Sequence, residues 1–146
     1  MQVTFREYIP SDLNDCLTIL KENHPDDYDD WETILLKDLT DISNKKYSSK
    51  FIIVLIRDEI IGFGCYFFQD TSYKITWVNI HSKEQNKGIG KKLVKELEKY
   101  IKRENPNNDF YITLETDKPY FYKKLKYQSH TNNGSNIIMQ KYFPLK

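Results

Sequence analysis

Apolar residues near the start of the chain recur first at the spacing of a strand and then at that of a helix. Residues 3–6 alternate between apolar and polar side chains, which predicts a short strand. Residues 10–12 (Pro-Ser-Asp) offer an N-terminal cap for a helix with an apolar stripe of Leu13, Cys16, Leu17 and Leu20. Residues 24–30 break this pattern. A second helix is then expected, with a buried face made of Trp31, Ile34, Leu35, Leu39 and Ile42.

Three runs in the middle of the chain have the composition of strands. A polar loop over residues 43–50 precedes residues 51–56, which are apolar at every position. A tight turn at 57–59 leads into a second apolar run at 60–68, and this pair is typical of a central hairpin. The next turn, at 69–72, leads into a strand that ends at Ile80. We therefore expect three consecutive antiparallel strands after the two helices.

The rest of the chain alternates helices with strands. Residues 91–102 form a helix with Leu93, Leu97 and Ile101 on one stripe, Val94 beside it, and lysine and glutamate around them. The Asn-Pro-Asn-Asn segment at 105–108 ends that helix. The strand at 110–114 must return through a right-handed crossover, so it is expected parallel to the strand ending at Ile80. A short helix at 119–125 and a last strand at 137–143 follow, and an additional strand near Tyr127 is left open.

A glycine-containing loop separates the strand ending at Ile80 from the basic helix. Two glycines one residue apart at such a junction let successive backbone N–H groups converge on an anion at the positive end of the helix dipole. The spacing excludes a P-loop, because Lys92 stands where Ser or Thr is needed, and a dinucleotide fingerprint, because Leu93 replaces the third glycine. Alone, the motif also fits a plain glycine turn. The loop reads Gln85, Asn86, Lys87, Gly88, Ile89, Gly90 and Lys91.

A second motif lies downstream, after one helix and one strand. It reads Pro119-Tyr120-Phe121-Tyr122-Lys123-Lys124-Leu125-Lys126-Tyr127. With the Gln-x-x-Gly-x-Gly loop it resembles the two signatures of the GNAT superfamily of N-acetyltransferases, over essentially the whole chain. The resemblance implies an α/β (α+β) fold, in which a mixed central sheet of about six to seven strands is flanked by about four helices. It also implies a single acetyl-CoA-binding domain over residues 1–146, with acetyl-CoA entering a V between two splayed strands.

The resemblance also implies how the cosubstrate is held. Backbone N–H groups of Gln85, Asn86, Lys87, Gly88, Ile89, Gly90 and Lys91 would bind the pyrophosphate of acetyl-CoA. Pantetheine would lie along the strand end from Val78 to Ile80, and the Ile80 N–H would polarise the thioester carbonyl. Lys87, Lys91 and Lys92 either add charge near the phosphates or are ordinary solvated lysines at the start of a helix.

Tyr122 aligns with the tyrosine that protonates the departing thiolate in this family. A phenol titrates near ~10 and a thiol near ~8.5, so the phenol can donate its proton to a nascent thiolate. The chain has 11 tyrosines, and Tyr120 is a nearby competitor. The register of the motif favours Tyr122.

The sequence departs from the family pattern at several positions. Lys126 replaces a glycine and Asn86 replaces another, although asparagine tolerates left-handed backbone angles. Glu115 stands where many members have an asparagine that touches pantetheine. The strand at 75–80 carries no carboxylate, so the general base is left unassigned among Glu115, His81 and a water held by backbone groups.

Charge is distributed unevenly along the chain. Residues 1–82 carry 8 Lys and Arg against 14 Asp and Glu (net −6), and residues 83–146 carry 14 against 7 (net +7). A basic half suits a polyanionic cosubstrate, and a nucleic-acid site is disfavoured because the chain as a whole is not strongly basic. The aromatic and acidic segment around the second helix start is either an attractive surface for a cationic amine or a solvated linker. Its members are Asp26, Asp27, Tyr28, Asp29, Asp30, Trp31 and Glu32.

Composition narrows the remaining possibilities. The chain has no apolar run of ~20 residues and no signal-peptide core, which predicts a cytoplasmic protein with no membrane partner. The oligomeric state, monomer or homodimer, is left open. Cys16 and Cys65 lie in no metal or catalytic motif, so no metal is expected and a covalent acetyl-enzyme is disfavoured. The hypothesis is therefore an acetyl-CoA-dependent N-acetyltransferase that acts on a primary amine of a small molecule or peptide by direct attack in a ternary complex. The alternative is a catalytically silent CoA-binding regulatory module.

Overall fold

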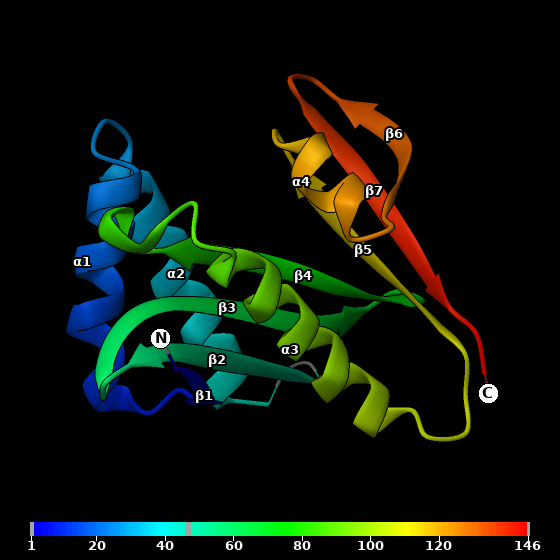
Figure 1. The fold of residues 1–146 in the computed structure, drawn as a ribbon, viewed down its shortest axis with the longest axis horizontal. Helices are drawn as coiled ribbons and strands as arrows, with labels where there is room; N and C mark the ends of the chain where they lie inside the picture. Colours follow the sequence, from blue (N-terminus) through cyan, green and yellow to red (C-terminus); the bar gives the residue numbers. More distant parts are fainter. Residues whose placement is uncertain (1, 46–47, 146) are drawn as a thin grey trace.

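The computed structural model of the protein describes residues 2–45 and 48–145 (Figure 1). Within these residues one seven-stranded sheet runs in the order β1-β2-β3-β4-β5-β7-β6. The α+β fold class expected from sequence is confirmed, and the strand left open near Tyr127 is β6. The elements are β1 Val3–Glu7, the 3-10 turn η1 Pro10–Asp12, α1 Leu13–Asn23, α2 Tyr28–Ser43, β2 Ser49–Ile56, β3 Glu59–Gln69, β4 Ser72–Ile80, the 3-10 turn η2 Ser82–Glu84, α3 Ile89–Glu104, β5 Phe110–Thr116, α4 Pro119–Lys124, β6 Gln128–Asn133 and β7 Asn136–Phe143.

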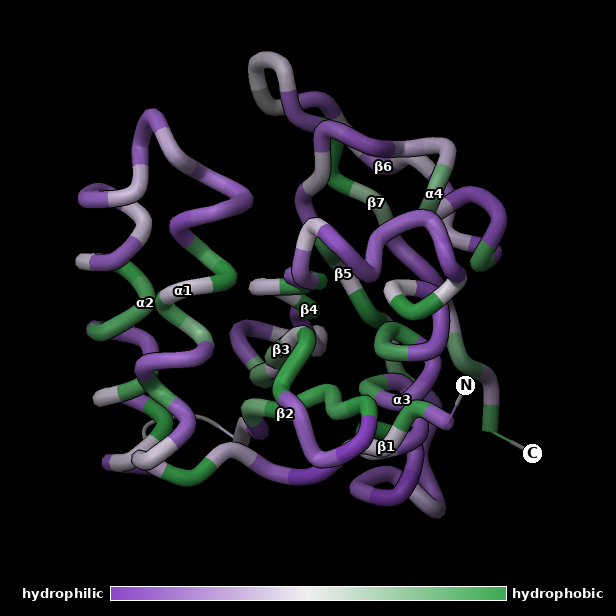
Figure 2. Tube along the Cα trace, turned by 60° about the vertical axis from the view of Figure 1, so that its left-hand side comes forward, coloured by the Kyte–Doolittle hydropathy of each residue, from purple (hydrophilic) through white to green (hydrophobic). Residues whose placement is uncertain are grey.

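Helices cover both faces of β2–β4, which explains the continuous apolar run in β2. Ile52 and Val54 point to the face covered by α3, where they pack in one cluster with Leu93 and Leu97. The intervening Ile53 belongs to the second cluster, under α1 and α2. Figure 2 shows α1 and α2 as a layer on one side of β2–β4 and α3 on the other. Alternating side chains are thus buried on both faces, as a central strand requires.

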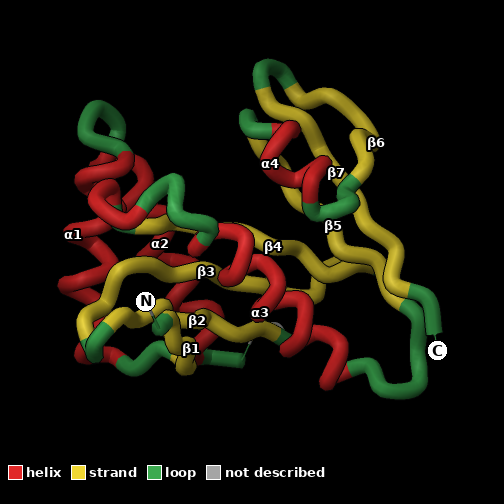
Figure 3. The backbone as a smooth tube through the Cα atoms, in the orientation of Figure 1, coloured by secondary structure: helices red, strands yellow, loops and turns green. Residues whose placement is uncertain are grey.

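β4 and β5 are neighbours for only a short distance. They pair in parallel at Tyr73 with Ile112 and at Lys74 with Thr113, and no further pair follows. β4 continues to Ile80 and β5 to Thr116, and the two strands diverge (Figure 3). β5, β7, β6 and α4 form one arm of the resulting V, and β1–β4 with α3 form the other (Figure 1). The parallel pairing expected from sequence is confirmed, and it is confined to the closed end of the V.

Three local predictions were wrong or incomplete. Asp12 does not cap α1: its carboxylate accepts two hydrogen bonds from Arg6 (2.8 and 2.9 Å) and one from the Ile9 N–H (2.9 Å), which ties β1 to the turn before the helix. Ile34 is 46% exposed, because the buried stripe of α2 passes through Leu35 and Leu39 instead. The polar loop expected at 43–50 is shorter at both ends, because α2 extends to Ser43 and β2 begins at Ser49; residues 46–47 within it lie outside the described residues.

No helix among the described residues is long and apolar enough to cross a membrane.

Candidate active site

The free edge of β4 is shaped by a bulge at Trp77. This residue has a φ of +60°, and the pairing of β3 with β4 shifts register beside it. Beyond the bulge, Phe63 faces Asn79, and the His81 N–H donates to the Ile61 carbonyl at 2.7 Å. Because bonding alternates along an antiparallel pair, residues 79 and 81 face β3, and residues 78 and 80 turn the other way. The backbone N–H groups of Val78 and Ile80 therefore face the V, where β5 has already diverged.

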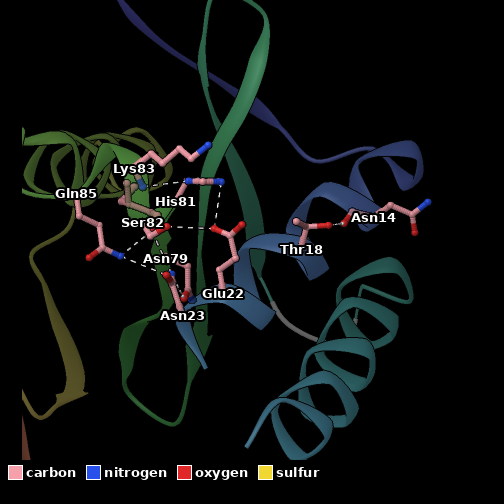
Figure 4. Close-up of polar contacts among 10 residues, drawn as sticks. Asn14, Thr18, Glu22, Asn23, Asn79, His81, Ser82, Lys83 and Gln85 are labelled. Carbon is pink, nitrogen blue, oxygen red and sulfur yellow. Dashed lines mark hydrogen bonds and ion pairs between the residues drawn. The ribbon is translucent and has the colours of Figure 1, made fainter. Parts of the chain in front are cut away.

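Side-chain amides replace the missing strand at the end of this edge (Figure 4). The Ile80 carbonyl accepts hydrogen bonds from Gln85 Nε2 at 2.9 Å and from Asn23 Nδ2 at 3.1 Å. Asn23 Nδ2 also donates to Asn79 Oδ1 at 3.1 Å, and Asn23 Oδ1 accepts from Gln85 Nε2 at 3.2 Å. The end of α1, the end of β4 and the first residue of the glycine loop are thereby joined.

The glycine loop delivers the chain into α3 with an uncapped helix N-terminus. Asn86 and Gly88 have φ angles of +64° and +78°, so asparagine takes the left-handed geometry that its position requires. No side chain caps the helix and no acidic residue lies in its first turn, and the Lys92 N–H is the first to bond within it, to the Gly88 carbonyl at 3.2 Å. The preceding N–H groups lack helical acceptors and, with the helix dipole, favour an anion.

The lysines around the loop differ in their partners. Lys87 Nζ pairs with Glu84 at 3.1 Å, so its charge is already partly neutralised within the loop. Lys91 and Lys92 are exposed in the first turn of α3, where positive charge is unfavourable unless an anion is present. Gly90 lies against α4, since a Cβ built on it would be 3.3 Å from Phe121 Cζ. The glycine loop and the second sequence motif are therefore in contact.

The two tyrosines of the second motif occupy different environments. Tyr120 is 76% exposed, whereas Tyr122 is 9% exposed and belongs to the core cluster beneath α3. Burial, assisted by Asp117, raises the pKa of Tyr122 to about 12. The Tyr122 hydroxyl is therefore protonated at neutral pH.

A buried carboxylate that the sequence interpretation missed lies behind Tyr122. Glu98 is 6% exposed and accepts hydrogen bonds from the Tyr127 hydroxyl at 2.8 Å and from Lys141 Nζ at 3.3 Å. The Tyr127 ring meets the Tyr122 ring edge-on, with centroids 5.8 Å apart. A signal for Glu98 was present in the sequence, because it falls on the apolar stripe of α3, four residues after Val94 and three before Ile101.

Lys126, which stands where the family has a glycine, adopts the left-handed backbone conformation that glycine favours, with a φ of +75°.

Both side chains considered for the general base already have hydrogen-bond partners, and neither is singled out by its surroundings. His81 Nδ1 accepts from the Lys83 N–H at 3.1 Å, which leaves the ring proton on Nε2, 3.1 Å from Glu22. Glu115 lies exposed on β5 and accepts from Asn136 Nδ2 at 3.1 Å. The geometry assigns no base.

The acidic linker, here residues 26–32 including the first turn of α2, contacts the bulge through aromatic rings. The Trp31 ring contacts the Trp77 ring edge-on, with centroids 5.7 Å apart, and the His24 ring, with centroids 5.1 Å apart. The Trp31 indole nitrogen donates a hydrogen bond of 2.6 Å to Asp27 Oδ2. Asp27 is therefore partly structural. Asp26, Asp29 and Asp30 are exposed.

The two cysteines are buried and free. Burial raises the pKa of Cys16 to about 12 and raises that of Cys65 further still. Neither can supply a thiolate at neutral pH, as expected for small core residues. Within the described residues no group of His, Cys, Asp and Glu side chains is arranged to hold a metal ion.

Comparison with known proteins connects this geometry to a family. Residues 13–127 match the model of the acetyltransferase (GNAT) family. The chain belongs to this family. GNAT proteins are acetyl-CoA-dependent acyltransferases, so the resemblance drawn from the two motifs is confirmed, and acetyl-CoA is the cosubstrate that the open edge of β4 and the uncapped α3 suit.

Solved GNAT structures share the fold at low sequence identity. The PaiA N-acetyltransferase of Thermoplasma acidophilum, solved with coenzyme A, is 20% identical with a TM-score of 0.79, over 98% of this chain and 100% of that one. An aminoglycoside 6'-acetyltransferase type Ii is 24% identical with a TM-score of 0.75, over 94% and 96%. A GNAT acetyltransferase of Staphylococcus aureus Mu50 is 17% identical with a TM-score of 0.77, over 97% and 99%. No curated protein matches the chain significantly in sequence.

Proposed function

We propose that this GNAT protein is an N-acetyltransferase that moves the acetyl group of acetyl-CoA to a primary amine by direct attack in a ternary complex. The observation that carries the proposal is the open edge of β4. Val78 and Ile80 present backbone N–H groups to the V, and the same edge leads directly into an uncapped helix N-terminus. A chain with an amide-rich arm and a pyrophosphate can follow both features at once.

Each step of the transfer except removal of the amine proton has a protein group to serve it, and the amine nitrogen would give that proton to water. The loop from Gln85 to Lys91 would bind the pyrophosphate through its backbone N–H groups, and Val78 would pair with pantetheine. The Ile80 N–H would donate to the thioester oxygen as negative charge develops there during attack by the amine nitrogen. When the carbon–sulfur bond breaks, Tyr122 would give its proton to the thiolate. With its pKa raised to about 12, the hydroxyl carries this proton at neutral pH, as a phenol of ordinary pKa also would.

Acetyl-CoA thiol release with a panel of amines tests this proposal, using Tyr122→Phe and the matched control Tyr120→Phe. General acid catalysis contributes roughly 10²- to 10⁴-fold, so the first variant is expected to lose about this much of kcat with little change in KM. The control should keep full activity, because Tyr120 is exposed on the same helix. Unchanged turnover in Tyr122→Phe would remove the acid but keep the enzyme. Saturable acetyl-CoA binding without turnover on any amine would favour the silent CoA-binding module.

For the acceptor we propose a cationic amine attracted by the acidic linker. Asp26, Asp29 and Asp30 are exposed beside the aromatic rings that lead to β4. Asp26→Asn is the clean test, because Asp27 also holds Trp31 in place. In Asp26→Asn we expect KM for a diamine with two positive charges to rise severalfold at low salt. KM for a monoamine with no second charged group should stay constant. A KM that is equal in both proteins at low salt would eliminate the linker as the attracting surface.

A further inference from the structure

The free edge of β4 is held in place by side chains where a strand would normally hold it. The Ile80 carbonyl receives Gln85 Nε2 and Asn23 Nδ2, and the next N–H, that of His81, donates to Ile61 at 2.7 Å. The peptide group between Ile80 and His81 is thus hydrogen-bonded through both its carbonyl and its N–H. Asn79, on the other side of Ile80, is fixed by its pairing with β3 and by the bond from Asn23 to its side-chain oxygen.

The orientation of both amides follows from their partners. Asn23 Nδ2 faces two acceptors, the Asn79 Oδ1 and the Ile80 carbonyl, and its Oδ1 faces the Gln85 donor (Figure 4). A flipped Asn23 would place oxygen against two oxygens. Asn23 is therefore fully used by this network, and it is the residue at which α1 ends, immediately before the linker at 24–27.

We propose that Asn23 and Gln85 are positioning residues for acetyl transfer, forming an amide clamp that fixes the direction of the Ile80 N–H toward the thioester oxygen. This inference rests on the proposed function, because it concerns the same backbone donor. An oxyanion donor is effective only when it is preorganised, and a strand end without a neighbouring strand lacks the usual means of holding one. The clamp supplies that means from residues far apart in sequence.

The structure offers a substitution that opens half of the clamp. Asn23→Asp keeps an oxygen to accept from Gln85 but cannot donate to the Ile80 carbonyl or to Asn79. Gln85 and the rest of the glycine loop should therefore stay in place, while the Ile80 backbone becomes more mobile. Asn23→Ala removes the same donors without adding charge at the end of α1, and serves if the aspartate perturbs folding. Asn14→Asp and Asn14→Ala are the matched controls on the exposed face of the same helix.

The test combines turnover with the backbone amide resonance of Ile80 in a nitrogen-15-labelled chain, a readout that requires no amine. In the native chain we expect this proton to move downfield with acetyl-CoA relative to coenzyme A, because only the former carries the acetyl oxygen. Asn23→Asp should abolish that difference and lower kcat by about 10- to 100-fold while keeping affinity for coenzyme A. The Asn14 variants should behave as the native chain.

Three results would overturn the clamp. The first is an Ile80 amide resonance in the native chain that is the same with acetyl-CoA and coenzyme A. The second is an unchanged resonance difference or kcat in Asn23→Asp and Asn23→Ala. The third is an equal loss of affinity for coenzyme A and acetyl-CoA in these variants, which a general structural role would cause. An Ile80 response that depends on Asn23, in a chain that acetylates no amine, would support the clamp and reject only the proposed transferase activity.

Discussion

The Trp77 indole nitrogen donates a 2.7 Å hydrogen bond to Asp38 from a backbone position with a φ of +60°. A left-handed conformation is unfavourable for a bulky residue, by about 1–3 kcal/mol. The bond to α2 and the edge-on contact with Trp31 hold the indole against the sheet, where it is 8% exposed. These contacts offset the strain of the bulge, and the bulge is what turns Val78 and Ile80 toward the V.

Removing Asp38 should therefore affect both stability and cosubstrate binding. Asp38→Ala leaves a buried indole N–H without its acceptor, and we expect a loss of about 1–3 kcal/mol in urea denaturation. Affinity for acetyl-CoA, measured by calorimetry, should fall as the bulge relaxes. Asp38→Asn retains an acceptor and should recover most of both quantities. Asp27→Ala breaks the other tryptophan–aspartate bond at an exposed site, and equal effects from Asp27→Ala and Asp38→Ala would contradict a special role for the bulge.

The left-handed glycines allow backbone strain to be separated from cosubstrate binding. Gly88 (φ +78°) and Gly134 (φ +65°) would each receive a Cβ in open space, so alanine causes strain but no clash, about 1–2 kcal/mol at each site. Gly134→Ala should lower stability and leave binding intact, because it lies in the β6–β7 turn. In Gly88→Ala the free loop can relax and must be strained again on binding, which predicts up to about tenfold weaker acetyl-CoA binding. Similar binding by the two variants would show that the Gly88 conformation is unimportant.

The buried Glu98 predicts a stability effect that the sequence pattern alone would not. Tyr127→Phe leaves the carboxylate with Lys141 as its remaining hydrogen-bond partner among the described residues, and we expect a loss of about 1–3 kcal/mol in the free energy of unfolding. Tyr142→Phe removes a bond of similar length, to Asp109 at 2.7 Å, from a residue that is 46% exposed. That control should cost less than about 0.5 kcal/mol. Equal losses by urea denaturation would argue against a buried network.

The sequence predicts most of the fold because apolar spacing records burial directly. The uninterrupted run in β2 marks a strand covered on both faces, and the stripe through Leu93, Leu97 and Ile101 marks one face of α3. The motifs also place the loop and Tyr122. Trp77 gives no such signal, since tryptophan has no preference for a positive φ, and the bulge exists only through tertiary contacts. Asn23 likewise meets Asn79 and Gln85 from 56 and 62 residues away, a proximity that only the folded chain creates.

The buried environment of Tyr122 predicts the pH dependence of the transfer. Its pKa is raised to about 12, so the hydroxyl is mostly protonated at pH values well below this in the free enzyme. An exposed phenol would begin to ionise near ~10 and would give a falling limb in kcat/KM there. We therefore expect kcat/KM to rise with pH as the acceptor amine loses its proton, and to show no decline attributable to Tyr122 between pH ~8 and ~10.5. In Tyr122→Phe the shape of the profile in this range should be unchanged and its height reduced. A falling limb with a midpoint at or below pH ~10 in the native chain, absent from Tyr122→Phe, would mean that the acid ionises too early for the burial observed.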